Sequence, residues 1–378
     1  MKRQYTLFVS IMLAFLLALT SCINMVPAPN AGPKPVSPIV STGALADIEA
    51  TLEQIYDLAN PSVVNISIVI GSNTTFPQDA MGSGFIWDKA GHIVTNNHVI
   101  ADADDITITF PDGTMVPGKL VGADFDSDLA VVKIDMPADR LKPLSMADST
   151  RLKVGQLVIA IGNPFGLQGT MTVGFISALG RMVPTDENAL GASYNIPDVI
   201  QTDASLNPGN SGGVLLDATG KVIGVTQSMA STSGSSAGVG FAIPAAIVQQ
   251  VVPSLIKTGR YDHPYLGISV VSMSPTLATA MNLSATQRGT MVGSITSGSP
   301  ADKAGLKASQ TRATINGHTV FVGGDVIIAF NDQTVKSSDD LITFLSRSGV
   351  IGGTVSLTVL REGKQIKVPV IIGARPGA

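Results

Sequence analysis

The stretch LNPGNSGGVLL, Leu206–Leu216, decides how the rest of this 378-residue chain is interpreted. Ser211 follows Gly209 by two positions and precedes a pair of glycines, and an apolar segment comes directly after them. Glycines adopt unusual backbone dihedral angles and let another backbone approach closely. A plain turn could use any small polar residue at position 211, whereas a nucleophilic site would require a hydroxyl there. The surrounding sequence has to distinguish these two interpretations.

The composition excludes several classes of protein. Hydrophobic residues make up 44% of the chain and charged residues 14%, which suits packed cores and argues against a disordered protein. The length favours two or three domains. The net charge is −4 and no long basic run is present, so nucleic acid is not an expected partner. The four histidines lack the spacing of zinc ligands, so we expect no metal site and no other cofactor.

Residues 1–21 have the pattern of an export signal. Lys2 and Arg3 precede an almost wholly apolar run that is short for a membrane span. The run ends in LTSC, which resembles the bacterial lipobox, where the chain is cut before a cysteine that then carries lipid. Cys22 is the only cysteine in the chain and is the expected lipidation site. A plain signal peptide, or a short anchor helix with an incidental cysteine, is the alternative.

The remainder divides into a proline-rich tether, residues 22–44, and two folded units, residues 45–258 and 264–374. In the first unit, short β-rich runs alternate with turn residues, and this pattern favours antiparallel barrels. Its length of about 190 residues between the two end helices suits two such barrels. The second unit mixes helices with strands and has the pattern of an α+β domain. The helices are predicted over 47–59, 245–258, 300–308 and 337–348, and the strands of the second unit over 266–271, 325–330, 354–361 and 365–372.

A serine hydroxyl is a useful nucleophile only beside a base, and histidine is the practical base near neutral pH. His263 and His318 fall in the second unit, away from the glycine turn. His98 lies in IVTNNHVI, where an apolar strand ends in a polar cluster. We expect the histidine at this strand end, where a rigid scaffold can present it to a cleft. A structural role in the core is the alternative for His98. His92 stands at a strand start and is expected to be structural.

Three aspartates precede the predicted strand LAVVKI. Asp128 adjoins the strand, so pleating lets its side chain point inward and orient a histidine. Asp124 and Asp126 are expected to stay in a solvated turn. The alternative is that all three carboxylates belong to a solvated acidic loop.

The glycine turn has a second chemical use. Successive backbone N–H groups can converge on one point and stabilise the oxyanion that forms when a carbonyl is attacked. The amides of Gly209 and Ser211, with Asn210 between them, are the candidates. A glycine-rich turn without this role is the alternative.

The motifs TNNHVI with His98, DSDLAVVKI with Asp128 and QTDASLNPGNSGGVL with Ser211 occur in this order, followed by GVGFAIP at 238–244. Together they closely resemble the HtrA/DegP family of bacterial envelope serine proteases over residues 50–373. The resemblance implies a mainly β fold, a chymotrypsin-like double six-stranded β-barrel, and a His98–Asp128–Ser211 triad. It also implies an extracytoplasmic location and assembly as a homotrimer. The lipobox adds attachment to a bacterial membrane through lipid at Cys22.

The same resemblance suggests which residues line the S1 pocket that receives the side chain before the cleaved bond. They are Leu206, Met229 and Val239, all of them apolar. Such a pocket cannot pair a lysine or arginine, whose unpaired burial is costly, so cleavage is expected after aliphatic residues. Aliphatic residues are buried in folded proteins, and the expected substrates are therefore unfolded or misfolded chains.

The unit at 264–374 resembles a PDZ domain through YLGI, SPADKAGL at 299–306 and GGDVIIAFND at 323–332. A PDZ domain binds peptide C-termini by strand addition, with the helix at 337–348 as the other wall of the groove. Residues 307–322 depart from the family and are predicted to form a hairpin at Asn316-Gly317, which could cover or extend the groove. The expected carboxylate-binding loop is Tyr265, Leu266, Gly267 and Ile268.

Two other classes of function compete with a protease. A holdase or PDZ scaffold on an inactive barrel would bind without cutting, and loss of a triad residue would favour it. A small-molecule esterase would share the nucleophile. The intact set of His98, Asp128 and Ser211 argues against the first class, and the PDZ-like unit argues against the second.

Overall fold

A computed structural model describes residues 43–71, 78–184, 195–227 and 238–376. The predicted signal peptide and nearly all of the tether lie outside these residues. The first described helix, α2, spans Ala44–Ala59 and so begins three residues earlier than predicted. None of the described helices combines the length and the apolar composition needed to cross a membrane.

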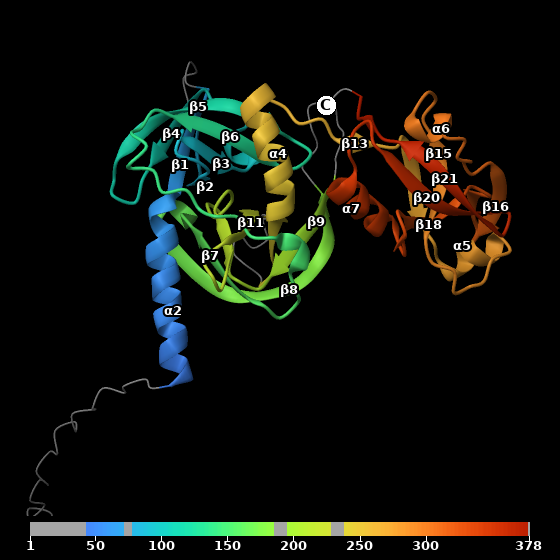
Figure 1. Ribbon diagram of the computed structural model, residues 1–378, viewed down its shortest axis with the longest axis horizontal. Coiled ribbons are helices and arrows are strands. Elements are labelled where there is room, and N and C mark those ends of the chain that lie inside the picture. Colours follow the sequence, from blue (N-terminus) through green and yellow to red (C-terminus); the bar gives the residue numbers. More distant parts are fainter. Residues whose placement is uncertain (1–42, 72–77, 185–194, 228–237, 377–378) are drawn as a thin grey trace, which may run out of the picture. The chain divides into compact units, whose positions relative to one another are not determined.

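The first β-barrel is closed and has the strand order β1-β2-β3-β6-β5-β4 (Figure 1). Side chains of alternate residues fill its interior, and Ile66, Ile93 and Ile108 are fully buried there. The predicted strand LAVVKI is present as β6. The elements are β1 Val63–Ile70, β2 Gln78–Ile86, β3 His92–Thr95, α3 Asn97–Ile100, β4 Asp105–Thr109, β5 Met115–Asp124 and β6 Leu129–Ile134, with the 3₁₀ turn η1 Asn60–Ser62 before β1.

The second barrel is also closed, with the order β10-β11-β12-β9-β8-β7. The two closed six-stranded barrels confirm the predicted fold class. The glycine turn around Ser211 leads directly into β10. The elements are η2 Ser149–Arg151, β7 Leu157–Gly162, η3 Pro164–Gly166, β8 Thr170–Pro184, β9 Asn195–Thr202, β10 Val214–Asp217, β11 Val222–Gln227 and β12 Gly240–Pro244.

One buried cluster joins the two barrels. It contains Phe85 and Val131 from the first barrel, Ile161 and Val214 from the second, and the apolar face of helix α4, Ala245–Thr258. The helix ends where the sequence predicts, because Gly259 adopts a left-handed conformation and donates its N–H to Leu255 O. This shared core fixes the two barrels relative to each other, and with them the residues that lie between them.

The C-terminal unit is an α+β domain with the main sheet order β14-β15-β18-β20-β21, in which β14 is an edge strand. Helix α6 is shorter than the predicted 300–308, because Leu306 N already bonds back to Ala301 O around the left-handed Gly305. The elements are β13 Pro264–Tyr265, β14 Ile268–Ser272, α5 Pro275–Ala280, β15 Thr290–Ile295, α6 Pro300–Lys303, β18 Val326–Phe330, β19 Gln333–Thr334, α7 Ser338–Ser348, β20 Thr354–Arg361, β21 Lys364–Ile371 and β22 Gly373–Ala374.

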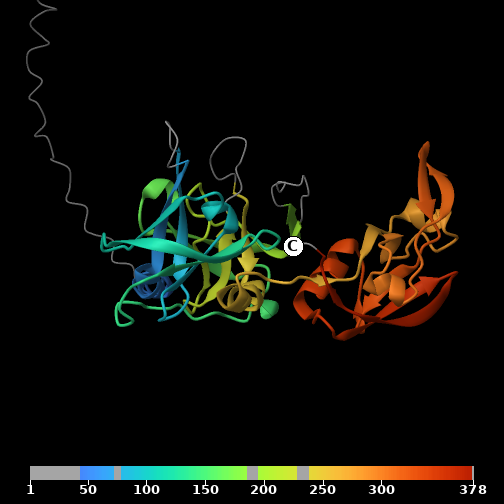
Figure 2. The same ribbon diagram turned by 90° about the horizontal axis from the view of Figure 1, so that it is seen from above.

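The predicted hairpin is present as β16, Thr311–Ile315, and β17, His318–Val322, and it projects from the sheet (Figure 2). Asn316 and Gly317 both have positive φ, +52° and +81°, as a two-residue hairpin turn requires. The apolar side of the hairpin packs in a cluster with α5, which includes Leu277. The hairpin therefore extends the domain on the side of α5.

Candidate active site

His98 lies in the one-turn helix α3 and not at a strand end, so that prediction was wrong. Strand β3 ends at Thr95, and the two asparagines that follow turn the chain. The side-chain amide of Asn96 and the backbone N–H of Asn97 both donate to Asp128 O, at 2.9 and 3.1 Å. These tertiary bonds stop the strand and start the helix that carries His98.

The structure brings His98 and Asp128 together. His98 Nδ1 lies 2.7 Å from Asp128 Oδ2, and the His98 backbone N–H donates to Asp128 Oδ1 at 2.9 Å. An ionised carboxylate only accepts hydrogen bonds, so Nδ1 carries the proton and Nε2 is left as the basic nitrogen. The side chain of His98 is 39% exposed, whereas that of Asp128 is only 7% exposed. A buried carboxylate thus orients an accessible imidazole.

A third group, missed from the sequence, also contacts the carboxylate. Gln227 Nε2 donates to Asp128 Oδ2 at 3.2 Å from the end of β11. The other amide atom, Gln227 Oε1, is buried without a hydrogen-bond partner. Periodicity could not reveal this contact, because the two residues are 99 positions apart.

The turn around Ser211 is held against strand β2. Ser83 N donates to Ser211 O at 2.8 Å, and Ser83 Oγ donates to Gly209 O at 2.7 Å. A Cβ at Gly212 would lie only 2.0 Å from Ser83 O, so no larger residue fits there. The neighbouring residue of β2, Gly82, packs against Val99, which follows His98 in α3. Strand β2 therefore supports both the serine turn and the histidine helix.

The backbone of the turn is bonded in a way that bears on the predicted oxyanion hole. Asn210 N donates to Asn207 O at 2.9 Å, and Asn210 O accepts bonds from Gly213 N and Thr226 Oγ1. Asn210 thus shapes the turn with its own backbone groups. Gly209 has φ +95°, a left-handed conformation that favours glycine. The amides of Gly209 and Ser211 remain the candidate oxyanion donors.

Two of the three residues predicted for the S1 pocket are described. Leu206 is buried, and a Cβ built at Gly240 would lie 2.7 Å from its Cδ1 atom. Val239, the neighbour of that glycine, is 51% exposed. Met229 lies outside the described residues. Leu206 and Val239 therefore lie close to Gly240, the one from across the fold and the other as its chain neighbour, and the glycine leaves space beside Leu206.

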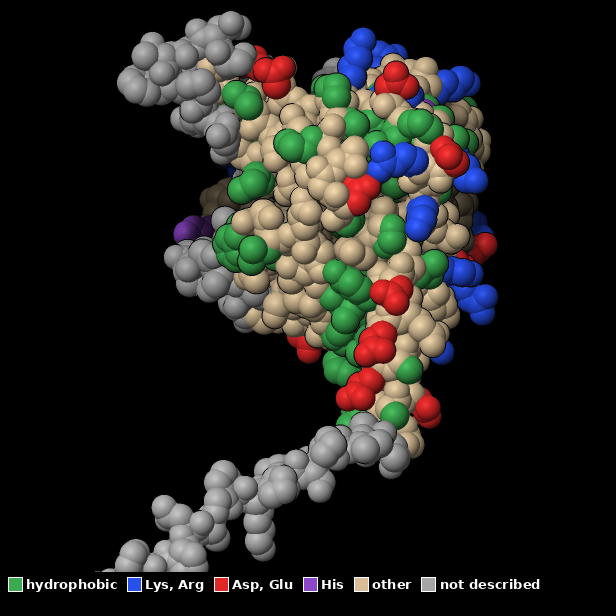
Figure 3. Space-filling model, turned by 90° about the vertical axis from the view of Figure 1, so that its left-hand side faces the viewer, with side chains coloured by type: hydrophobic (Ala, Val, Ile, Leu, Met, Phe, Trp, Pro, Cys, Tyr) green, Lys and Arg blue, Asp and Glu red, His purple; other side chains and the backbone are tan. Residues whose placement is uncertain are grey.

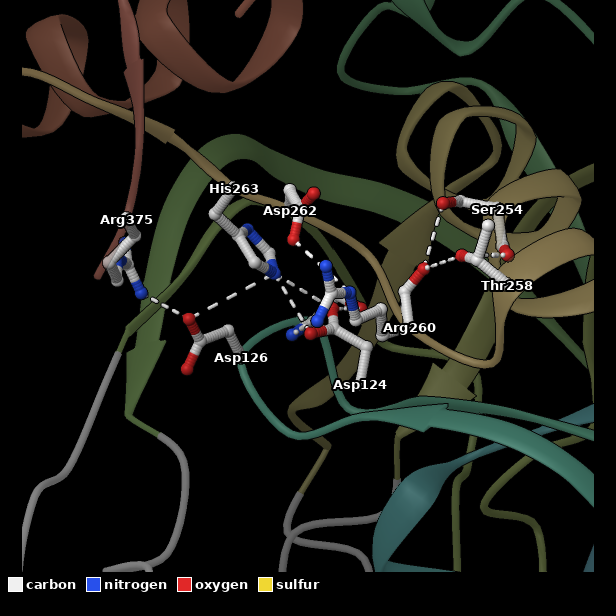
Figure 4. A network of polar contacts seen from close by, with 9 residues as sticks. Asp124, Asp126, Ser254, Thr258, Arg260, Asp262, His263 and Arg375 are labelled. Atoms are coloured by element: carbon white, nitrogen blue, oxygen red, sulfur yellow. Dashed lines mark hydrogen bonds and ion pairs between the residues drawn. The ribbon is translucent and has the colours of Figure 1, made fainter. Parts of the chain in front are cut away.

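The expectation that Asp124 and Asp126 occupy a solvated turn was wrong. Asp124 is 6% exposed, and the side chain of Asp126 is 11% exposed. His263, which the sequence placed with the second unit, lies in the linker with its Nε2 atom 2.9 Å from both oxygens of Asp124 (Figure 4). Burial raises the pKa of Asp126 above its ordinary value, although the nearby charges of Arg375 and His263 oppose the shift.

The remaining histidines lie elsewhere. His92 Nδ1 lies 2.6 Å from Asp88 Oδ2, at the start of β3, in agreement with a structural role. His318 is an exposed residue of the β16–β17 hairpin. Among the residues that the structure describes, no group of three or more histidine, cysteine, aspartate or glutamate side chains is arranged to hold a metal ion. Cys22 lies outside them.

The residues predicted for the carboxylate-binding loop connect β13 to β14. Leu266 O and Gly267 O accept bonds from Ala301 N and Thr296 N, both at 2.9 Å, which fixes the loop on α6 and the end of β15. A groove runs between this loop with strand β14 and helix α7. Among the described residues, none from the β16–β17 hairpin lines this groove, so the hairpin neither covers nor extends it. The lining includes Tyr265, Leu266, Gly267, Ile268, Val270, Leu341, Ile342 and Leu345.

A double β-barrel with an oriented histidine, a glycine-flanked serine held on β2, and an added α+β domain defines the class of trypsin-like serine proteases with a PDZ domain. Comparison with family models agrees, since a trypsin-like peptidase domain matches residues 82–225 and a PDZ domain matches residues 264–372.

Similar proteins narrow the class. Protease Do-like 1 of Arabidopsis thaliana, a chloroplastic protein, is 39% identical over 334 residues, which cover 87% of this chain and 73% of the relative. A Brucella suis protein named "Probable periplasmic serine endoprotease DegP-like" is 40% identical over 79% of this chain and 53% of its own length. The solved structure of the HtrA-type protease AlgW with a decapeptide has a TM-score of 0.67 and 33% identity, covering 86% of this chain and 99% of that one.

The chain belongs to the HtrA/DegP family of serine proteases, which confirms the resemblance drawn from its motifs. It spans about half the length of the Brucella relative. A serine endoprotease from Yersinia pestis is a further structural neighbour, with a TM-score of 0.57, 30% identity, and coverage of 89% of this chain and 99% of that one.

Proposed function

We propose that this chain is a serine endopeptidase that cleaves proteins with His98, Asp128 and Ser211 as its triad. The observation that carries the proposal is the 2.7 Å hydrogen bond from His98 Nδ1 to the buried carboxylate of Asp128. This bond leaves Nε2 to take the proton of Ser211 Oγ as the oxygen attacks the substrate carbonyl carbon. Asp128 stabilises the imidazolium that forms.

The rest of the reaction follows from the same groups. The imidazolium returns its proton to the leaving amine as the peptide C–N bond breaks, and the acyl group stays on Ser211. Water then attacks the acyl-enzyme with His98 again as the base, which releases the acid and restores the serine. The amides of Gly209 and Ser211 stabilise each oxyanion, and one such donor is worth about 2.7–4 kcal/mol of barrier.

The substrates are unfolded or misfolded proteins, cut after aliphatic residues. The apolar side chains of Leu206 and Val239 support an S1 pocket of this kind, and Met229 completes the proposed set. Discrimination among aliphatic residues is weak, because one methylene group changes the binding free energy by about 1–3 kcal/mol.

The PDZ domain binds peptide C-termini. Strand β14 is at the edge of its sheet, next to helix α7, so a peptide can add as a further strand between them. Backbone N–H groups of the loop from Tyr265 to Ile268 then receive the terminal carboxylate. The AlgW structures, which contain a decapeptide or a tripeptide, support peptide binding by this family.

The protein acts outside the cytoplasm, held to a bacterial membrane by lipid at Cys22. Relatives named as periplasmic endoproteases support the extracytoplasmic part of this proposal.

The assembly is a homotrimer formed through the N-terminal part of the protease domain. Large apolar side chains lie exposed on that part, where Figure 3 shows them beside α2. Met81 of β2 is among them, and large exposed apolar side chains of this kind favour association with further copies of the chain.

The test uses residues 45–378 and a Ser211→Ala copy, each incubated with unfolded casein, with the cut sites mapped by mass spectrometry. Cuts after aliphatic residues that are absent from the Ser211→Ala digest would support both the triad and the S1 assignment. Cleavage that persists in the variant would reject Ser211 as the nucleophile. Absence of cleavage together with binding of unfolded casein would favour a holdase instead.

A further inference from the structure

The turn between β5 and β6 delivers Asp128 to His98, and its geometry depends on a second aspartate. Asp124 Oδ2 accepts hydrogen bonds from both the backbone N–H and the hydroxyl of Ser127, the former at 3.1 Å. Asp128 N closes the turn on Phe125 O at 3.2 Å. The carboxylate of Asp124 therefore stabilises, from within, the turn that ends at Asp128.

The turn needs this stabilisation because Asp128 has an unfavourable backbone conformation. Its φ is +52°, in the left-handed region, which costs a non-glycine residue about 1–2 kcal/mol, although aspartate tolerates it better than most. This conformation turns its carboxylate toward His98 and its carbonyl toward Asn96 and Asn97. A looser turn would let Asp128 relax and would move the imidazole that it orients.

His263, in the linker, fixes the carboxylate of Asp124 by a hydrogen bond. Its Nε2 atom is 2.9 Å from both oxygens of Asp124, and it must carry the hydrogen because a carboxylate only accepts (Figure 4). Asp124 and the side chain of His263 are 6% and 15% exposed. Ser127 donates only to Oδ2, so without the imidazole Asp124 Oδ1 would lose its donor, and leaving an oxygen of a buried carboxylate unpaired is costly.

The imidazole is itself fixed by its neighbours. The ring of Tyr261 packs edge-on against it at 4.8 Å, and burial raises the pKa of the Tyr261 phenol, which therefore stays neutral. The carbonyl of Arg260 accepts bonds from the hydroxyls of Ser254 and Thr258 at the end of α4. The linker is thus attached to the end of α4 directly before the histidine.

The other charged groups around His263 are Asp126 and Arg375. Asp126 Oδ2 lies 3.9 Å from the imidazole and forms an ion pair with Arg375. Arg375 N donates to His263 O at 3.0 Å, next to the pairing of β13 with β22. These contacts give the imidazole several partners, but Asp124 is the one on which the turn depends.

From this geometry we infer that His263, acting through Asp124, is a positioning residue for Asp128. It fixes the turn that orients the triad, although it lies 135 positions after Asp128 in the chain, in the linker to the PDZ domain. The inference rests on the proposed triad. It predicts that losing the imidazole impairs the chemical step and leaves peptide binding in the S1 pocket nearly unchanged.

His92 and Asp88 supply a matched control. This pair likewise joins a histidine to an aspartate, here both from the first barrel, with Nδ1 2.6 Å from Oδ2 and the imidazole 14% exposed. It lies at the turn before β3 and does not touch the turn that carries Asp128. His92→Ala removes a comparable histidine–aspartate contact, so it reports the general effect of such a loss on the domain.

The experiment compares wild type, His263→Ala, His263→Gln, His92→Ala and Ser211→Ala in residues 45–378. The readouts are the rate of fluorophosphonate labelling at Ser211, kcat and KM on a peptide that wild type cleaves, and the downfield NMR resonance of the His98 Nδ1 proton. Circular dichroism confirms folding.

We expect His263→Ala to lower the labelling rate and kcat about 10- to 100-fold with little change in KM, as displacement of a catalytic group does. The downfield resonance should weaken or shift. His263→Gln, whose Nε2 can still donate to Asp124, should recover much of the activity. His92→Ala should label like wild type.

Equal labelling of His263→Ala and wild type would overturn the inference, and so would equal losses in His263→Ala and His92→Ala. If His263→Ala does not fold, Ser127→Ala removes the hydroxyl bond to Asp124 alone. It must then lower the labelling rate for the inference to stand. Failure of wild type to label at Ser211 would instead reject the proposed triad.

Discussion

The hydroxyl of Ser83 supports the turn around Ser211, and the effect of its removal on stability can be calculated from its hydrogen bonds. The side chain is fully buried, and Oγ donates to Gly209 O at 2.7 Å and accepts from Asn163 N at 2.8 Å. Ser83→Ala deletes both bonds, together with a longer one of 3.4 Å from Asn163 Nδ2. The Gly209 carbonyl belongs to the same peptide unit as the Asn210 amide, so the substitution frees a peptide of the proposed oxyanion turn.

The expected magnitude follows from the burial of the two partners. Asn163 is 1% exposed, and leaving its N–H unsatisfied costs about 1–3 kcal/mol. Gly209 is half-buried, so water can replace part of its bond and the loss is about 1 kcal/mol. The free energy of unfolding should therefore fall by about 2–4 kcal/mol. The rate of fluorophosphonate labelling at Ser211 should also fall.

Ser62→Ala is the control, because Ser62 is equally buried but its hydroxyl has no hydrogen-bond partner. Its loss should leave stability unchanged or slightly raise it. Urea unfolding can be followed by fluorescence of Trp87, the only tryptophan of the chain, which packs on the core between the barrels. Unfolding free energies of the two variants within about 0.5 kcal/mol of each other would refute this reasoning.

Three further substitutions have defined outcomes. Although burial opposes it, His92 holds the pKa of Asp88 below its ordinary value of 3.8. Asp88 thus contributes stability above pH 3.8 that is lost as the pH falls through the lowered pKa, and the stability difference between wild type and Asp88→Asn should shrink over that range in thermal melts. Arg361 holds the fully buried Asp325 through two bonds of 2.7 Å, so Arg361→Met should destabilise the PDZ domain by about 3–5 kcal/mol without changing the urea transition reported by tryptophan fluorescence. Gly240→Ala should lower kcat/KM for peptides cut after leucine about 10- to 200-fold relative to those cut after alanine, because its methyl group narrows the proposed S1 pocket; an unchanged ratio in peptide assays would contradict that assignment.

The sequence predicted those elements whose signal is local. Strand β6 matches its apolar run, helix α4 ends at its glycine, and the hairpin turns at Asn316-Gly317. Each of these depends on periodicity or on a residue with a particular backbone preference. The order of the three motifs, which identified the family, is also information carried by the linear sequence.

The errors arose where distant residues decide the local structure. The run before His98 looks like a continuing strand, but Asp128 O ends it by bonding to two asparagines. Asp124 has the appearance of a solvated turn residue, yet His263, 139 positions away, pairs with it in a nearly buried site. No local pattern contains such partners.

The most direct test of the account is to label residues 45–378 with a fluorophosphonate and to map the modified residue in wild type and in His98→Ala. The phosphonyl group bonds to a serine oxygen and displaces fluoride only where a base accepts the serine proton. The account predicts one label per chain, on Ser211, that is lost in His98→Ala. A folded wild-type protein that takes no label, or a label on Ser211 that does not depend on His98, would contradict it.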